Sequence, residues 1–422
     1  MRDDLHDSKR SAGHFQPFEV NVPEPVLDDL RERLARTRWI EEMSDGGWTF
    51  GLSVAYMREL VGYWRHKFDW RAAETAINRF AHFRADLDGR RVHFIHERGR
   101  GPDPLPIVLT HGFPDSFLRF AKIVRMLADP ASCGADPADS FDVVVPSLPG
   151  YAFSDPPAKD GMTFHIGDLW HRLMTQGLGY QRFAAHGGDW GGLVTELLAR
   201  DHADSVLGIH LTDVPFHHAF QKPAKASRKE KKYLETIAKF GQKEGAYALI
   251  QGAQPQALAL GLNDSPAGLA AWIVEKFRRW SDCHGDVETR FTRDELLSNV
   301  MLYWVTGTIN TSFAPYYDFA HAGARTWIRE KLKEWRGSSE VPAAFAMFPK
   351  ELSSPPREWA ERFFNVRRWT EMPRGGHFAA FEEPELLVND LREFFRPLRR
   401  GLAKERAPLR RAGRPHAASP RS

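Results

Sequence analysis

Cysteine is almost absent from this chain, which has Cys133 and Cys283 as its two examples among 422 residues. They stand far apart and form no paired spacing, so the sequence indicates neither a disulfide framework nor a cysteine metal site. No internal repeat is visible either. What remains is typical of a globular protein with an ordinary core, at 42% apolar and 27% charged residues.

Long apolar runs are lacking as well. No stretch is long enough to span a bilayer, and the polar start Met1–Arg10 lacks the apolar centre of a secretory signal. We therefore expect no membrane anchor and a cytoplasmic location.

A strong charge of either sign is also missing, since the net charge is +3. Residues 401–422 hold six basic side chains and one acidic one, Glu405, so the positive charge of this tail is larger than the net charge of the whole chain. The rest of the chain is therefore mildly acidic. The basic run Lys222–Lys232 is typical of a solvated face. Neither feature predicts a nucleic-acid partner, and the Pro/Arg/Ala-rich tail is expected to be disordered.

Short β-rich runs alternate with helical segments from about residue 86 onward. This alternation predicts an α/β protein with a mostly parallel, doubly wound sheet that is covered by helices on both faces. Residues 215–324 interrupt it with helical runs such as Leu269–Phe277, which predicts an inserted cap. The expected strands are Val92–Glu97, Pro106–His111, Phe141–Pro146, Phe183–His186, Val206–Leu211, Ala343–Phe348 and Arg367–Met372.

These patterns divide the chain into six expected parts. Tryptophans in the N-terminal part are expected to pack it onto another domain rather than to bind a ligand. The parts are a disordered leader at 1–14, a meander packing on the core and cap at 15–85, a first core part at 86–214, the helical cap at 215–324, a second core part at 325–400 and the basic disordered tail at 401–422.

A glycine-flanked turn, Gly187–Gly192, carries Asp189 at its apex between a short apolar run and the helix formers Leu193–Arg200. A strand, a tight turn and a helix with one reactive side chain form the setting of a nucleophile elbow. Serine at the apex suits acyl transfer. A carboxylate instead attacks a saturated carbon and forms an ester that water then cuts. The alternative is a plain turn in which Asp189 is a local cap.

An aspartate nucleophile needs a base and an orienting acid, and both have candidates in the expected chain order. His377 lies in the glycine-rich turn Arg374–Phe378, between the last strand and the last helix. Glu351 follows the strand that ends at Phe348–Lys350. Alone, a loop histidine or a loop glutamate is more often structural, so the combination carries the prediction.

The oxyanion site also has a candidate at the end of an expected strand, in His111–Pro114. The glycine lets the backbone turn, and the N–H groups of Phe113 and Trp190 are placed to meet negative charge on the Asp189 carboxyl during ester hydrolysis. The alternative is a simple strand-ending turn.

Three motifs together resemble the α/β-hydrolase epoxide hydrolases of the microsomal-type branch. They are His111–Pro114, Gly187–Gly192 and Arg374–Leu387, and an N-terminal segment like Phe15–Phe18 is typical of that branch. The similarity runs from about residue 15 to 397. It implies an α/β-hydrolase fold, with Asp189 as nucleophile, His377 as base and Glu351 as its partner. The membrane anchor of the vertebrate enzymes is absent from this sequence, so membrane association is not carried over.

The resemblance also implies two lid tyrosines in the cap. Tyr247, in Glu244–Tyr247, resembles the first. The second follows the motif Trp304–Ile309 and is assigned by spacing to Tyr316, with Tyr317 as the alternative. Two phenols can bind one epoxide oxygen and protonate it as the ring opens. Alone, a buried tyrosine is usually a packed aromatic with a satisfied hydroxyl.

These features predict an epoxide hydrolase that converts a small-molecule epoxide and water to a vicinal diol, with no cofactor and no metal. A haloalkane dehalogenase shares the aspartate elbow and is the alternative enzyme. A catalytically silent binding protein of the same fold is the alternative outside enzymes. The sequence names neither the epoxide nor its regiochemistry, and it leaves the oligomeric state open, with a homodimer as one option.

Overall fold

The computed structural model describes residues 15–412 except for 44–45, 88, 158–161, 222, 224, 322–325, 327–329 and 331–338. The expected leader at 1–14 lies outside the described residues, as do the end of the tail at 413–422 and the expected cap boundary at 324.

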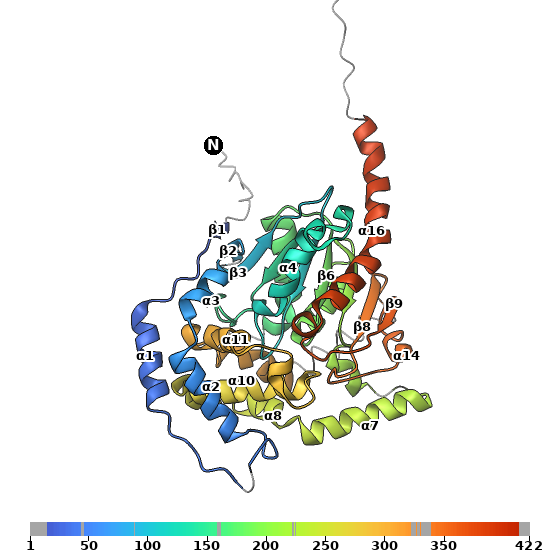
Figure 1. The fold of residues 1–422 in the computed structure, drawn as a ribbon. Coiled ribbons are helices and arrows are strands. Elements are labelled where there is room, and N and C mark those ends of the chain that lie inside the picture. Colours follow the sequence, from blue (N-terminus) through green and yellow to red (C-terminus); the bar gives the residue numbers. More distant parts are fainter. Residues whose placement is uncertain are drawn as a thin grey trace, which may run out of the picture.

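A nine-stranded sheet forms the centre of the molecule, in the order β1-β2-β3-β5-β4-β6-β7-β8-β9. The pairs from β1 to β5 are antiparallel, and those from β5 through β4 to β9 are parallel. The α/β class predicted from the sequence is confirmed (Figure 1). The strands are β1 Phe15–Pro17, β2 His82–Leu87, β3 Arg90–Glu97, β4 Leu105–Thr110, β5 Phe141–Pro146, β6 Phe183–Gly187, β7 Val206–Leu211, β8 Pro342–Met347 and β9 Asn365–Glu371.

The expected boundary at residue 85/86 is wrong, because β2 runs across it and pairs along its length with β3. The sequence of β2 alternates polar and apolar residues. Its burial is mixed, because Ala85 and Leu87 are buried and Asp86 is exposed, but the polar His82 is buried as well. By contrast, β5 and β7 are buried along their whole length. Their apolar runs made them visible in the sequence, whereas β2 was not.

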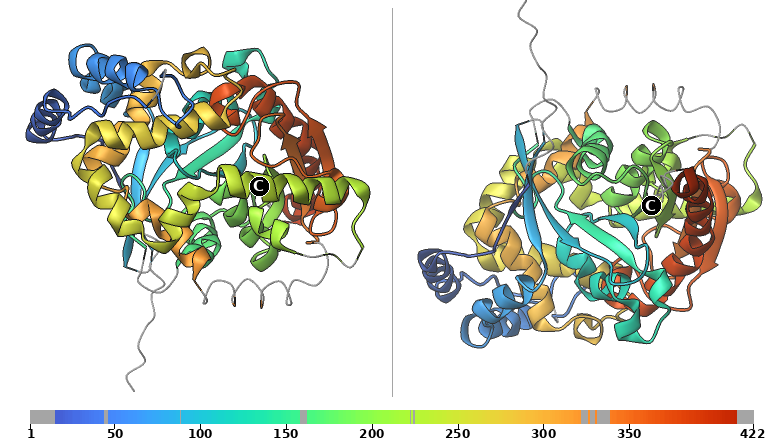
Figure 2. Two further views of the ribbon diagram at one scale, coloured as in Figure 1. Left: turned by 90° about the horizontal axis from the view of Figure 1, so that it is seen from below. Right: turned by 90° about the horizontal axis from the view of Figure 1, so that it is seen from above.

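Helices cover both faces of this sheet (Figure 2). The helix α4 packs against α16, and α5 packs against α6. Helix α6 begins directly after β6, so the end of a buried strand and the start of a buried helix meet at one turn. The core helices are α4 Ala121–Ala128, α5 Ile166–Arg172, α6 Trp190–Asp201, α14 Arg357–Ala360, α15 Ala379–Glu382 and α16 Pro384–Ala412.

Between β7 and β8 the described chain is helical and forms a cap over one end of the sheet (Figure 1). Local sequence sets where several of these helices begin. Ser227 and Glu230 form a capping box, Thr292 and Glu295 form another, and the Ser265 hydroxyl accepts the N–H of Gly268. The cap helices are α7 Arg228–Lys243, α8 Ala246–Ala253, α9 Pro255–Asp264, α10 Pro266–Trp280, α11 Arg293–Thr306 and α12 Ala314–Ala320.

The N-terminal segment leaves the sheet at β1, crosses the cap and returns at β2. Its helices α1 Glu24–Ala35, α2 Val54–His66 and α3 Trp70–Ile77 contact α10 and α11. Their apolar faces supply the contact, since Leu30, Leu60 and Trp64 are buried. Two polar links add to it, from Arg33 to Asp264 and from the Tyr63 hydroxyl to Asp294.

The last helix is longer than expected. α16 continues to Ala412, so the first part of the stretch 401–422, expected to be disordered, is helical. The residues Leu402–Ala407 are good helix formers that continue an established helix, and this outweighs the basic composition.

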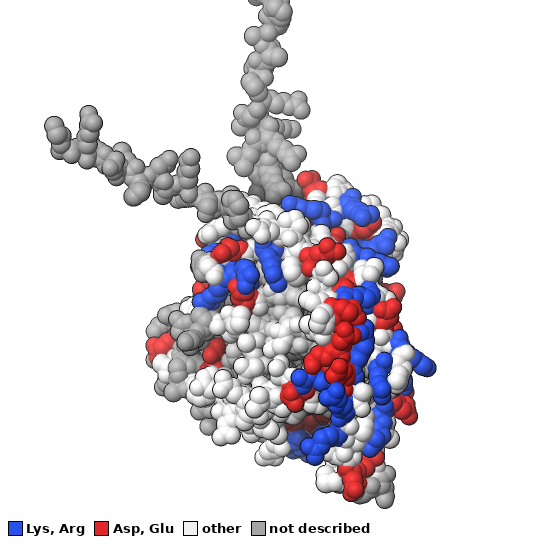
Figure 3. Space-filling view, turned by 90° about the vertical axis from the view of Figure 1, so that its left-hand side faces the viewer, with Lys and Arg blue, Asp and Glu red and all other residues white. Residues whose placement is uncertain are grey.

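Among the described residues no single helix is long and apolar enough to cross a membrane. Helices α9 and α10 reach that length only as a pair, and they bend by 117° at their junction. On the face in Figure 3, charged side chains gather along one side and leave a broad uncharged area beside them.

Candidate active site

Asp189 occupies the sharp turn between β6 and α6. Its backbone has φ 58° and ψ −130°, a conformation that non-glycine residues rarely adopt. Such strain persists where the surrounding structure fixes it, and it is typical of functional turns. The turn holds the carboxylate at the carboxyl end of the sheet, where ligands bind in open α/β folds.

Two backbone N–H groups hold the Asp189 carboxylate. The Phe113 N–H donates to Oδ1 over 2.9 Å, and the Trp190 N–H donates to the same carboxylate. Gly112 makes this approach possible, because a Cβ at that position would lie 2.2 Å from Asp189 Oδ1. The loop after β4 therefore reaches the nucleophile candidate, as the sequence predicted.

His377 lies on the other side of Asp189, in the turn between β9 and α15. Its Nε2 is 3.6 Å from Asp189 Oδ2 and has no hydrogen-bond partner. Its Nδ1 is 2.7 Å from Glu351 Oε1. The structure thus brings the three residues predicted from the sequence together, with His377 between Asp189 and Glu351.

The charges of this group are coupled. Burial works against a protonated imidazole, but the carboxylates of Glu351 and Asp189 outweigh it and raise the pKa of His377 to about 9. Burial raises the pKa of Asp189, while His377 and the two N–H donors oppose that rise. The two neighbouring acids therefore favour the protonated form of the imidazole in the free site.

The backbone of His377 is tied to the cap and to the core. Its N–H donates to the Trp280 carbonyl over 2.9 Å, and its carbonyl accepts a hydrogen bond from Arg119 over 2.5 Å. Arg119 is also bonded to Asp115, and although burial opposes it, Arg119 holds the pKa of Asp115 well below its usual range. This buried pair was not predicted from the sequence, although the i, i+4 spacing of Asp115 and Arg119 is a visible signal.

The two predicted lid tyrosines come from α8 and α12, and their rings lie 5.7 Å apart. The Tyr316 ring is 5.5 Å from Phe113 and 5.1 Å from Trp190, the two residues whose N–H groups hold Asp189. Its hydroxyl is buried and has no hydrogen-bond partner of normal geometry. Tyr317 instead is 44% exposed and stacks on His321. The geometry therefore favours Tyr316 over Tyr317.

Asp213 is a neighbour of this group that the sequence analysis missed. It comes just after the carboxyl end of β7, the strand beside β6, and it is buried. The rule that ligand sites lie at the carboxyl ends of parallel strands could have drawn attention to it.

One buried group of described residues has the chemistry of metal ligands: Glu196, His217 and His218. However, Glu196 already pairs with Arg200 over 2.7 Å and with His218 over 2.9 Å. A divalent cation there would add to the charge of Arg200 in a buried place, with one carboxylate to balance both. We interpret this group as a buried ion network.

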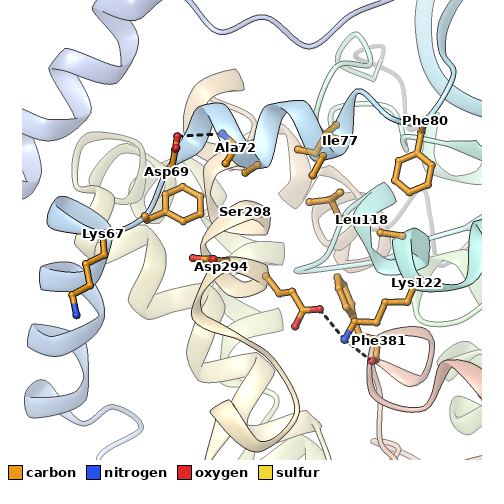
Figure 4. Close-up of a pocket in the computed structure, with 15 residues that line it drawn as sticks. Lys67, Asp69, Ala72, Ile77, Phe80, Leu118, Lys122, Asp294, Ser298 and Phe381 are labelled. Carbon is orange, nitrogen blue, oxygen red and sulfur yellow. Dashed lines mark hydrogen bonds and ion pairs between the residues drawn. The ribbon is translucent and has the colours of Figure 1, made fainter.

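A groove of about 400 Å³ lies elsewhere, between α3, α4 and α11 (Figure 4). Its floor is largely apolar, and an ion pair between Lys122 and Glu295 lies at its side. None of the predicted site residues lines it.

Comparison with known proteins decides the family. Residues 15–120 match the family described as "Epoxide hydrolase N terminus", and residues 106–245 match the "alpha/beta hydrolase fold". "Epoxide hydrolase 1" of Oryctolagus cuniculus is 34% identical over 90% of this chain and 88% of its own length. The chain belongs to the epoxide hydrolase family.

Other epoxide hydrolases extend this likeness over most of the chain. A protein of Stigmatella aurantiaca (strain DW4/3-1) named "Putative epoxide hydrolase" is 41% identical over 91% of this chain and 85% of its own length. The structure of the Aspergillus niger epoxide hydrolase superposes with a TM-score of 0.79 at 28% identity, over 92% of this chain and 98% of that one. The predicted α/β-hydrolase fold and epoxide hydrolase function are confirmed.

Proposed function

We propose that this epoxide hydrolase opens its substrate by direct attack of the Asp189 carboxylate on a ring carbon. Oδ1 accepts the N–H of Phe113, so Oδ2 is assigned as the attacking atom. The new carbon–oxygen bond forms as the ring carbon–oxygen bond breaks, and the product is an ester on Asp189.

Tyr247 and Tyr316 supply the proton that the opening ring oxygen needs. Burial raises the pKa of both phenols, so both remain protonated donors at neutral pH. The Tyr316 hydroxyl, buried without a partner of normal geometry, is the single observation that carries this step. A buried donor in that state gains most from a ligand that accepts a hydrogen bond.

His377 acts in the second half of the reaction. Esterification removes the negative charge of Asp189, one of the two charges that raise the pKa of His377. The imidazolium then gives up its proton more readily, and that proton restores the phenol that donated to the ring oxygen. The neutral imidazole takes a proton from a water molecule, while Glu351 keeps Nδ1 in place. The water attacks the carboxyl carbon of the ester, Phe113 and Trp190 hold the developing oxyanion, and the diol leaves.

Every group in this sequence of steps is an ordinary side chain or backbone N–H, so the proposal includes no metal and no cofactor. The substrate class is a small-molecule epoxide. The cytoplasmic location and the homodimer remain predictions, which cell fractionation and size-exclusion chromatography with light scattering would test.

The test is a turnover screen with terminal, aryl and bulky disubstituted epoxides, run beside chlorinated alkanes of matched size. We expect diol from at least one epoxide and no halide release, because the two phenols suit an oxygen leaving group. Halide release without diol formation would favour the haloalkane dehalogenase instead. Tight binding of an epoxide with no turnover would favour the silent binding protein.

A further inference from the structure

Asp213 lies against the first turn of α6, the helix that begins at the nucleophile turn. A Cβ added to Gly192 would be 2.9 Å from Asp213 Oδ1, so glycine at that position leaves room for the carboxyl group. Asp213 is 9% exposed, and its Oδ1 is buried. The mechanism above gives this residue no role.

Asp213 follows β7 and Glu351 follows β8, the parallel strand beside it, so both buried carboxyl groups lie at the same edge of the sheet. A buried oxygen of each has no hydrogen-bond partner. One is Asp213 Oδ1, and the other is Glu351 Oε2. The other carboxyl oxygen of Glu351, Oε1, already accepts hydrogen bonds from His377 Nδ1 and from the Leu352 N–H. Two buried carboxyl groups that influence each other, each with an unpaired oxygen, form a stable arrangement when one carries a proton.

The surrounding charges point to Asp213 as the protonated member. The charged groups that act on Asp213 are Glu351, His377, Asp189 and Arg119. Burial raises the pKa of Tyr233 on α7, and Asp213 adds to that rise. If Asp189, Glu351 and Asp213 were all ionised, these three buried anions would share His377 as their cation, because Arg119 is already paired with Asp115.

Both burial and the nearby Glu351 carboxylate raise the pKa of Asp213 well above its usual range. Glu351 Oε1 already lies within hydrogen-bond distance of His377 Nδ1, whereas Asp213 Oδ1 has no hydrogen-bond partner. The proton therefore belongs on Asp213.

We propose that Asp213 is a positioning residue, a neutral carboxylic acid whose O–H donates to Glu351 Oε2 and holds the Glu351 carboxylate on His377. This role rests on the proposed function, in which His377 is the base and Glu351 orients it. The donated hydrogen bond also draws charge from Glu351. It thereby keeps the imidazole acidic enough to give up its proton in the ester intermediate.

The test compares Asp213→Asn with Asp213→Leu, which are similar in size and differ in the donor. The readout is the acid limb of the kcat pH profile, which follows the loss of the His377 proton in the intermediate. Asparagine keeps a neutral donor, so we expect the acid limb of the Asp213→Asn profile to lie at the same pH as that of the parent. Leucine removes the donor, so the full charge of Glu351 should move the limb to higher pH, by about half a unit or more.

A limb that moves to lower pH in Asp213→Asn would show that the parent residue is an anion and would overturn the proposal. Profiles that match the parent in both variants would overturn it as well. Infrared difference spectra of parent and Asp213→Asn at pH 7 provide a readout that needs neither turnover nor the leucine variant. We expect a protonated-carboxyl C=O band in the parent that the asparagine variant lacks, and its absence from the parent would again contradict the proposal. A parent without epoxide turnover would overturn the proposed function and leave this spectroscopic result standing by itself.

Discussion

The charge on Asp189 governs the basicity of His377. Nε2 lies 3.6 Å from Asp189 Oδ2, and the carboxylates on its two sides outweigh burial to raise its pKa to about 9. The protonated form of His377 is therefore favoured in the free site. In the proposed mechanism, it becomes a base only after Asp189 has been neutralised as an ester.

This coupling predicts a lower pKa for His377 in Asp189→Ala. Removing one of the two facing anions should lower it by about one unit or more, since the imidazolium loses an attraction in a buried site. NMR titration of the His377 ring in parent and variant, after circular dichroism has shown that both are folded, measures it. Equal values in the two proteins would contradict the coupling.

The phenols make a second prediction at this scale. Tyr247→Phe and Tyr316→Phe should each slow ring opening, by something on the order of 10- to 1,000-fold, because each removes one proton donor and keeps the ring. The double variant should be slower than either. Tyr317→Phe is the matched control, since this ring is 44% exposed and stacks on His321. A slow Tyr317→Phe beside an unaffected Tyr316→Phe would reverse the assignment.

The loop after β4 shows how closely a backbone element must approach the nucleophile. A Cβ at Gly112 would lie 2.2 Å from Asp189 Oδ1, the oxygen that accepts the Phe113 N–H. Gly112→Ala should therefore push the loop away and lower kcat about 100-fold or more, the usual loss when an oxyanion donor is misplaced.

The matched control is Gly241→Ala on α7, where a Cβ meets nothing within 4 Å. This variant should keep the activity of the parent and gain slightly in helix stability. Gly112→Ala with full activity would show that the Phe113 N–H is not needed.

The sequence predicted those strands and turns that have a strong local pattern of their own. Apolar runs predicted β5 and β7, and glycine-rich turns predicted the positions of Asp189 and His377. It did not predict β2, whose alternating pattern is half polar, or Asp213, which reaches the site only because β7 lies beside β6. Such neighbourhoods depend on strand order, which no local pattern contains. The roles of the site residues remain predictions.

The whole molecule joins three parts, and the N-terminal segment holds the cap mainly by apolar packing. Leu30 is 5% exposed, whereas the side chains of the Arg33–Asp264 pair are 38% and 78% exposed. Leu30→Ala should therefore lower the free energy of unfolding by about 2–5 kcal/mol. Arg33→Ala should lower it by about 1 kcal/mol or less, because exposed ion pairs contribute little. Denaturant unfolding of both variants measures this, and a larger loss for Arg33→Ala would contradict it.

The central claim is that Asp189 forms a covalent ester, and one measurement tests it most directly. A single turnover in ¹⁸O-water, with enzyme in excess over an epoxide that the screen has identified, should leave the label in the Asp189 side chain. The first diol should carry unlabelled oxygen from the enzyme, because water attacks the carboxyl carbon of the ester. Mass spectrometry of the diol and of the Asp189 peptide reads both. Label found directly in the first diol, with none in Asp189, would show that water attacks the epoxide itself and that the carboxylate is not the nucleophile.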